Sequence, residues 1–348
     1  MGIRTLAREL NLSIGTVSRA LNDRPDVNES TRARVKEAAR RSGYVPDQSG
    51  RSLRKGRTGI VAAIVPTSGI GGQADSGFFR ILEGCRRGLL ERELDLIVLF
   101  RGAEEDPLEH LRRIVSRRLA DAVIVNQTKP DDPRLDYLRA AGVEHVVLGR
   151  SGAHDLGNWV DFDHAGAAAE AARLFLRAGH RELALVLSAL EMNYELLLAD
   201  AFRAEVARYG LGPDAVRVIR AGTNGRLTEE GRALFTSGRR PSAILAGHES
   251  IAAALYADLG GLGLRPGLDV GLISASPTEE NKSLAHSLTH FETDLEAGGA
   301  ALADRIVALL PEPGTMRKPL PPSLIPMLLQ VRTSHLGELD ARRFAHSA

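Results

Sequence analysis

From Gly59 onward, short apolar runs alternate with longer amphipathic segments, and this alternation constrains the fold more than any other feature of the sequence. Such runs are typical of strands buried in a parallel sheet, and the longer segments have the spacing of helices that cover it. The runs form two sets of four, which predicts an α/β body of two doubly wound, parallel-sheet lobes. The predicted strands are Ile60–Val65, Leu94–Phe100, Ala122–Val125, His145–Leu148, Leu183–Leu187, Val216–Ile219, Ala243–Ala246 and Val270–Ile273. The predicted helices include Phe79–Glu93, Glu109–Arg117, His164–Ala178, Ala199–Tyr209 and Ser250–Leu259.

The N-terminal segment, residues 1–57, differs from the rest of the chain in charge. It carries thirteen arginines and lysines against six acidic residues, whereas the whole chain has a net charge of only +1. A basic segment joined to a mildly acidic remainder is typical of a nucleic-acid-binding module fused to a second domain. Charge alone leaves open a basic segment that is merely solvated.

The same segment has the apolar spacing of three short helices. Apolar residues at i, i+3, i+4 and i+7 predict a first helix over Ile3–Leu10. Ser13 can cap a second helix over Ile14–Leu21, and Asn28 can cap a third that Gly43 ends. A capped second helix with hydroxyls and an arginine on one side suits a helix-turn-helix that contacts phosphates and guanine. A generic helical bundle would carry the same caps.

Several short motifs run through this segment without a gap. They are Leu6-Ala7, Ser13, Thr16–Asn22, Val27, Thr31-Arg32, Val35, Ala38-Ala39, Gly43–Pro46 and Arg51–Gly56. Together they resemble the head and hinge of the lactose-repressor/galactose-repressor (LacI/GalR) family of transcriptional regulators. The resemblance implies an all-α helix-turn-helix DNA-binding domain over residues 1–46 and a hinge helix or linker over 47–58. It also implies a repressor that binds a roughly palindromic operator as a homodimer.

The resemblance implies which residues contact operator DNA. Ile14, Gly15 and Arg19 are expected to face base edges in the major groove, where Ile14-Gly15 departs from the larger polar pair of some relatives. In the hinge, Leu53 is expected to wedge into the central base step from the minor groove, with Arg54 beside it in that groove. Phosphates are expected to be held by Ser13, Thr16, Asn22 and Tyr44, with Ser18 adding a hydroxyl on the same side.

Residues 59–335 resemble, more weakly, the two-lobed fold of periplasmic sugar-binding proteins. The landmarks are Phe78-Phe79, Gly179–Arg181, Leu288–Asp294 and Leu324–Ser334. The resemblance implies an effector-binding and dimerisation domain whose ligand lies between the lobes, at the carboxyl ends of the strands. Three crossings between the lobes are expected, near residues 157–161, 287–290 and 321–326. Lobe one is expected over 59–158 and 289–322, lobe two over 159–288 and 323–335, and a polar tail over 336–348.

The positions that match the family's pocket suit a sugar, because aromatic rings stack on its apolar faces while amides and charges bind its hydroxyls. The expected ligand-binding residues are Phe78, Phe79, Asn126, Arg150, Asp163, Met192, Asn193, Tyr194, His248 with Glu249, and Ser276. Phe78 and Phe79 also fit a core, and Asp163 also fits a helix N-cap.

Two departures leave the identity of the sugar-like effector open. Leu198 stands where many relatives carry an arginine, and Ser274–Pro277 where many carry an aspartate. Two alternatives therefore remain: a regulator that senses a non-sugar metabolite such as a purine, and a regulator that needs a corepressor.

The sequence favours neither an enzyme nor a cofactor. Gly69–Ala74 imitates a dinucleotide-binding fingerprint, but Pro66–Ser68 separates it from the preceding strand and no acidic residue follows the second strand.

A single cysteine, Cys85, permits no disulfide framework or cysteine metal cluster within one chain. We expect no metal, no membrane span and a cytoplasmic protein. In the family that the chain resembles, tetramers need a C-terminal leucine heptad, which residues 336–348 lack, so the resemblance implies a dimer.

Overall fold

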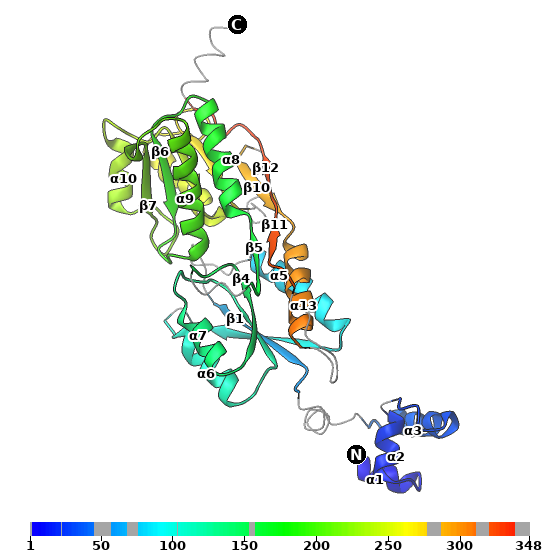
Figure 1. Ribbon diagram of the computed structural model, residues 1–348. Coiled ribbons are helices and arrows are strands. Elements are labelled where there is room, and N and C mark those ends of the chain that lie inside the picture. Colours follow the sequence, from blue (N-terminus) through cyan, green and yellow to red (C-terminus); the bar gives the residue numbers. More distant parts are fainter. Residues whose placement is uncertain are drawn as a thin grey trace. The chain divides into compact units, whose positions relative to one another are not determined.

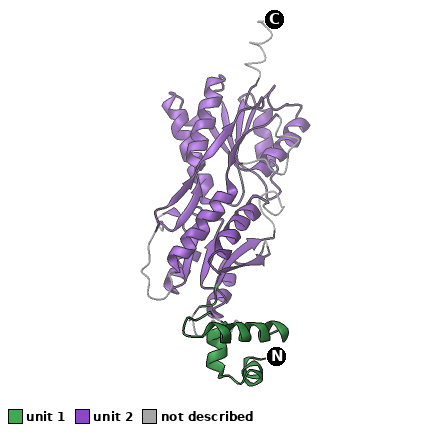
Figure 2. Ribbon diagram, turned by 90° about the vertical axis from the view of Figure 1, so that its right-hand side faces the viewer, with its two compact units in different colours: residues 1–59 green, residues 60–348 purple. Residues whose placement is uncertain are grey.

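The structure is a computed structural model that describes residues 2–21, 23–44, 57–67, 76–102, 104–152, 157–276, 287–310 and 320–337. The chain divides into two compact units, which we name the head (residues 1–59) and the body (residues 60–348) (Figure 2). Among the described residues, no helix has both the length and the apolar character needed to cross a membrane.

The head is built from three helices, α1 (Ile3–Glu9), α2 (Ile14–Leu21) and α3 (Glu29–Arg41), which match the predicted bounds to within one residue. The Asn28 side chain caps α3 by accepting from two backbone N–H groups of its first turn. Asn11 turns the chain between α1 and α2 with a positive φ of 51°. Small and branched apolar side chains fill the core of the head, namely Leu6, Ala7, Val17, Ala20, Val27, Val35, Ala38 and Ala39.

The first sheet of the body has six parallel strands in the order β11-β5-β4-β3-β1-β2. Its strands are β1 (Ile60–Pro66), β2 (Asp95–Arg101), β3 (Ala122–Val125), β4 (Glu144–Leu148), β5 (Trp159–Phe162) and β11 (Ser323–Ile325). Alternate residues of β1 face opposite cores, so helices cover both faces. One face is covered by α5 (Ser76–Leu90) and α13 (Leu295–Leu309), and the other by α6 (Pro107–Ser116) and α7 (Pro133–Ala140).

The second sheet repeats this plan in the order β12-β10-β9-β8-β6-β7, with β12 antiparallel to β10 and the other pairs parallel. Its strands are β6 (Leu183–Leu187), β7 (Val216–Arg220), β8 (Ala243–Ala246), β9 (Gly271–Ser274), β10 (Thr289–Thr293) and β12 (Met327–Gln330). Its helices are α8 (His164–Arg177), α9 (Asn193–Arg208), the 3-10 helix η3 (Pro213–Ala215), α10 (Glu229–Thr236) and α11 (Glu249–Gly261). All eight predicted strands are present, and the predicted fold class is confirmed.

The chain passes between the two sheets later than the expected lobe boundaries place it (Figure 1). Strands β5 and β11 belong to the first sheet, and β10 belongs to the second. The crossings therefore fall after these strands, near Asp163, Asp294 and Pro326. The first two follow the expected ranges, and the third lies within the expected 321–326. The physical reason is backbone pairing, since each strand satisfies its N–H and C=O groups against the sheet it joins before the chain leaves that lobe.

Candidate DNA-reading helix and ligand cavity

Helix α2 presents a capped N-terminus and several of the expected DNA contacts at the surface of the head. The Ser13 hydroxyl accepts from the Thr16 backbone N–H at 2.9 Å and lies 2.9 Å from the Thr16 hydroxyl. Ile14, although apolar, is 46% exposed. The Arg19 side chain is half exposed and its Nε lies 3.3 Å from Oδ2 of Asp26. This surface offers hydroxyls, a methyl-rich side chain and a guanidinium together.

Ser18 does not join that surface, because it is buried with only 5% of its area exposed. On α2 the side chains of Val17, Ser18 and Ala20 all face the core of the head. The small Ser18 side chain therefore packs inside the head, and its expected place on the DNA-facing side is wrong. Tyr44 packs against the same core and is partly buried.

Asn22, Leu53 and Arg54 lie outside the described residues, as does most of the expected hinge over 47–58. The phosphate contact of Asn22 and the minor-groove wedge of Leu53 stay predictions.

The body holds a cavity of about 180 Å³ at the carboxyl ends of strands from both sheets. Its wall combines apolar side chains from both lobes with amide, imidazole and carboxylate groups. The cavity brings together seven of the expected ligand-binding residues, namely Phe78, Asn126, Met192, Tyr194, His248, Glu249 and Ser276. Glu249 is 7% exposed.

Phe79 and Arg150 do not line the cavity. Phe79 is 40% exposed, because α5 turns it away from the face on which Phe78 is buried. Arg150 donates from Nε to Asp161 Oδ2 at 2.7 Å, and its guanidinium lies 5.1 Å from the centre of the Trp159 ring. Both partners belong to β5, so the Arg150 guanidinium is held against this strand beside the lining residue Asp161.

Asp163 and Asn193, at the starts of α8 and α9, also lie outside the lining. Asp163 caps α8 by accepting from the Gly166 N–H at 2.9 Å, as the alternative interpretation of this residue expected. The Asn193 N–H donates to the Thr128 carbonyl at 2.8 Å, which is a backbone contact between the two lobes. This contact sits beside the cavity, since Thr128 itself lines it.

Sequence reasoning missed His164 and Asp161, which both line the cavity. The His164 ring lies 4.6 Å from the Tyr194 ring, and its Nε2 lies 3.9 Å from Asp161 Oδ1. Its Nδ1 is buried and has no hydrogen-bond partner in the described part of the chain. Burial lowers the pKa of His164, and the charge of Arg150 adds to this, whereas Asp161 opposes it. Recognition of Trp159–Phe162 as a strand would have found both residues, because residues that follow a strand line this cleft.

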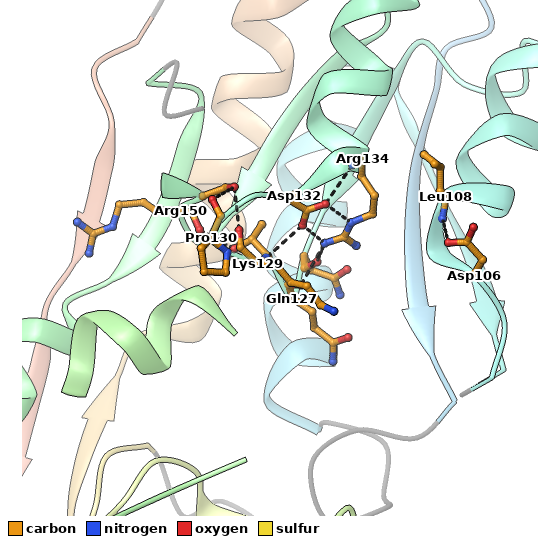
Figure 3. A network of polar contacts seen from close by, with 11 residues as sticks. Asp106, Leu108, Gln127, Lys129, Pro130, Asp132, Arg134 and Arg150 are labelled. Atoms are coloured by element: carbon orange, nitrogen blue, oxygen red, sulfur yellow. Dashed lines mark hydrogen bonds and ion pairs between the residues drawn. The ribbon is translucent and has the colours of Figure 1, made fainter. Parts of the chain in front are cut away.

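A polar network fixes the loop after β3 that carries Asn126 to the cavity (Figure 3). Nη2 of Arg134 donates to the carbonyls of Asn126 and Gln127 at 2.8 and 3.0 Å, and to Asp132 Oδ2 at 2.6 Å. Although burial opposes ionisation, the Arg134 guanidinium holds the pKa of Asp132 below its ordinary value. Asn126 therefore meets the cavity from a loop that is braced before any ligand arrives.

The charged side chains among the described lining residues are Asp161 and Glu249, and neither lysine nor arginine occurs among them. Arg150 pairs with Asp161 at 2.7 Å and balances that carboxylate, so the described wall offers an anionic ligand no lining lysine or arginine and one further carboxylate, Glu249, that would repel it. The described wall suits an uncharged ligand that carries hydrogen-bonding groups.

Comparison with known proteins agrees with this two-part plan. The family model for bacterial regulatory proteins of the lacI family matches residues 3–47, and the periplasmic binding protein-like domain matches residues 172–334. The HTH-type transcriptional regulator AglR of Rhizobium meliloti is 31% identical over 317 residues, covering 88% of this chain and 87% of AglR. These matches define a helix-turn-helix regulator with a periplasmic-binding-protein-like body.

Two solved structures show the same fold. The lac repressor dimer bound to operator and the anti-inducer ONPF aligns with a TM-score of 0.80 at 19% identity, over 97% of this chain and 99% of that one. A complex of the transcriptional regulator CelR with cellobiose aligns with a TM-score of 0.65 at 22% identity, over 96% and 99%. The chain belongs to the LacI family of DNA-binding transcriptional regulators.

Proposed function

We propose that this regulator is a repressor whose affinity for its operator is set by a small, uncharged sugar or sugar-like ligand in the body cavity. The observation that carries the proposal is the cavity itself, in which the Phe78 and Tyr194 rings lie with the amide of Asn126 and the imidazole of His248. Rings of this kind stack on the apolar faces of a sugar, and the polar groups bind its hydroxyls. The solved complex of CelR with cellobiose supports a carbohydrate in a body of this fold.

The proposed DNA contacts lie on α2 and at its start. Arg19 would donate to a guanine edge, Ile14 would contact a thymine methyl group, and Ser13 with Thr16 would hold phosphates. Operator binding as a homodimer on a roughly palindromic site is supported by the lac repressor, whose solved structure is a dimer on its operator. The protein would act in the cytoplasm as a regulator and not as an enzyme, as its relatives are regulators.

The proposed link between ligand and operator is the spacing of the two lobes. The cavity wall comes from both lobes, and the Asn193 N–H meets the Thr128 carbonyl across the cleft. A ligand that fills the cavity would therefore stabilise one spacing of the lobes. Since β1 begins at Ile60, directly after residues 57–59, a shift of the first lobe would pass to the chain segment that joins it to the head. The ligand could favour release or corepression.

A thermal-shift panel on the full-length protein tests the ligand class. Neutral mono- and disaccharides, sugar phosphates, hexuronates and purines would be compared at equal concentrations, because a ligand that binds the native state raises the melting temperature. We expect a neutral sugar to raise it, and we expect Tyr194→Ala to remove the shift while the exposed-site control Phe79→Ala retains it. A shift produced by a purine or a sugar phosphate alone would contradict the proposed ligand class.

A further inference from the structure

We propose that Asp26 and Gly15 are positioning residues for Arg19. Asp26 restrains the Arg19 guanidinium, and Gly15 leaves the space that it occupies, in the geometry with which Arg19 contacts its base pair. This inference rests on the proposed role of Arg19 as a DNA contact and assigns two further residues to base discrimination. Asp26 approaches Arg19 from the loop between α2 and α3, and Gly15 lies one helical turn before Arg19 on α2.

The Arg19–Asp26 ion pair uses the side of the guanidinium. Nε of Arg19 lies 3.3 Å from Oδ2 of Asp26. A contact through Nε does not use the edge formed by the two terminal Nη atoms. That edge is the fork that matches the O6 and N7 acceptors of guanine. Asp26 therefore restrains the guanidinium without occupying the part that recognises the base.

The loop that carries Asp26 is itself anchored. Nη2 of Arg32, on α3, donates to the carbonyls of Arg24 and Val27 at 3.1 and 2.9 Å, on either side of Asp26. Val27 is also buried in the core of the head. A carboxylate held between two fixed residues is a suitable brace, because an arginine restrained before binding loses less rotamer entropy on the DNA.

Gly15 provides the space that the guanidinium occupies. A Cβ added at Gly15 would lie 3.4 Å from Nη1 and 4.0 Å from Cζ of Arg19, which is ordinary van der Waals contact. A methyl group therefore fits, whereas a longer side chain would compete with the guanidinium for the same surface. The absence of a base-reading side chain at Gly15 thus allows Arg19 to lie along α2.

The carboxylate also works against indiscriminate binding. Asp26 is exposed and pairs with Arg19, the proposed base contact, so its charge would repel the nearby DNA backbone at every sequence. At the correct operator, the restraint on Arg19 favours binding and offsets part of this repulsion. At other sequences Arg19 has no matching base pair, so the repulsion is not offset. Asp26 should therefore weaken non-specific binding while it sharpens discrimination at the base pair that Arg19 contacts.

The test measures base discrimination in the full-length protein. An operator is selected from a random duplex library with the unaltered chain. Dissociation constants are then measured at one salt concentration for that operator, for its single-base-pair variants and for an unrelated duplex. The proteins are the unaltered chain, Asp26→Asn, Asp26→Glu, Arg19→Ala, the double variant of Asp26→Asn with Arg19→Ala, and Asp23→Asn as a matched control. Asp23 lies in the same loop and carries the same charge, but it pairs with Lys36 and Arg32.

We expect Asp26→Asn to reduce discrimination about two- to fivefold at the base pair that Arg19→Ala also ceases to discriminate, in the range of an exposed ion pair. Binding of the unrelated duplex should strengthen. The Arg19→Ala background should abolish the effect on discrimination, Asp26→Glu should restore part of it, and Asp23→Asn should change all duplexes alike. If Asp26→Asn changes every duplex by one common factor, Asp26 only repels phosphates and the positioning role is overturned. If Arg19→Ala leaves discrimination intact, Arg19 is not the reader, and the proposed DNA contact fails together with the inference.

A second pair of variants tests the space at Gly15. Gly15→Ala should retain discrimination at the same base pair, whereas Gly15→Leu should reduce it. Both replacements raise helix propensity over glycine, so a loss in the leucine variant alone cannot come from a weaker α2. Equal discrimination by both variants would overturn the role of Gly15.

Discussion

At the scale of single residues, burial decides which side chains act in recognition. Ser18 belongs to a motif of the family but is buried, because α2 turns it with Val17 toward the core of the head. His164 belongs to none of the motifs that the sequence analysis singled out, yet it lies in the cavity wall beside Tyr194. The residue type alone suggested a role for Ser18 and none for His164. The orientation of α2 removes Ser18 from the surface, and the position of His164 after β5 places it in the cavity wall.

The buried state of His164 predicts a pH dependence of stability. Its pKa is lowered from 6.5 in the folded chain, chiefly by burial, so the unfolded chain takes up a proton below pH 6.5 that the folded chain does not. Stability should therefore fall as the pH drops below about 6.5, by at most about 1.4 kcal/mol per pH unit from this group. Urea unfolding of the unaltered chain and of His164→Gln at pH 7 and pH 5 measures the contribution. Equal losses of stability in the two proteins would show that His164 is not the group responsible.

At the scale of elements, the two helices on one face of the first sheet touch through glycines. A Cβ added at Gly299 on α13 would collide with the backbone carbonyl of Ile81 on α5, and one added at Gly84 would collide with the carbonyl of Glu296. The neighbouring Cys85 is fully buried, and burial raises the pKa of its thiol to about 12. Helices α5 and α13 lie side by side (Figure 1). Helix α13, which follows the second crossing, therefore shares one core with α5 of the first lobe.

This packing predicts a position-specific cost for alanine. Gly299→Ala should destabilise the protein by about 1–3 kcal/mol, because backbone atoms of α5 must move to make room. Gly260→Ala is the matched control, since Gly260 lies on α11 and a Cβ there meets nothing within 4 Å. The control should be neutral or stabilising by up to about 1 kcal/mol. Urea midpoints for both variants provide the measurement, and a Gly299→Ala variant as stable as the control would refute the close approach.

The fold was predictable from sequence wherever a strand is a continuous apolar run, as in Leu183–Leu187. It was not predictable where a strand is short and mixed, as in Trp159–Phe162, Thr289–Thr293 and Ser323–Ile325. These three segments complete the two sheets at the crossings, so missing them displaced the expected lobe boundaries. Asp161 and His164 were missing from the expected site for the same reason. A residue at the end of a strand can be recognised as a site residue only after the strand itself has been predicted.

At the scale of the whole molecule, the chain joins a helix-turn-helix head to a body whose cavity draws on both lobes. The cavity could be placed from sequence because parallel strands bring their carboxyl ends to a common edge. Seven of its lining residues were expected, and the helix-capping role of Asp163 was recognised as an alternative. The structural role of Arg150 was not, because its partner Asp161 lies on β5, a strand that the sequence analysis did not predict. The central claim is that occupation of this cavity changes the affinity of the head for operator.

That claim is tested most directly by measuring operator affinity with and without the sugar that raises the melting temperature. We predict a change of about 5- to 150-fold, which corresponds to a coupling of about 1–3 kcal/mol, and reciprocity requires operator DNA to change sugar affinity by the same factor. Tyr194→Ala should bind operator without responding to the sugar, because the cavity rather than the head is altered. An operator affinity that stays constant while the sugar saturates the cavity would contradict the account.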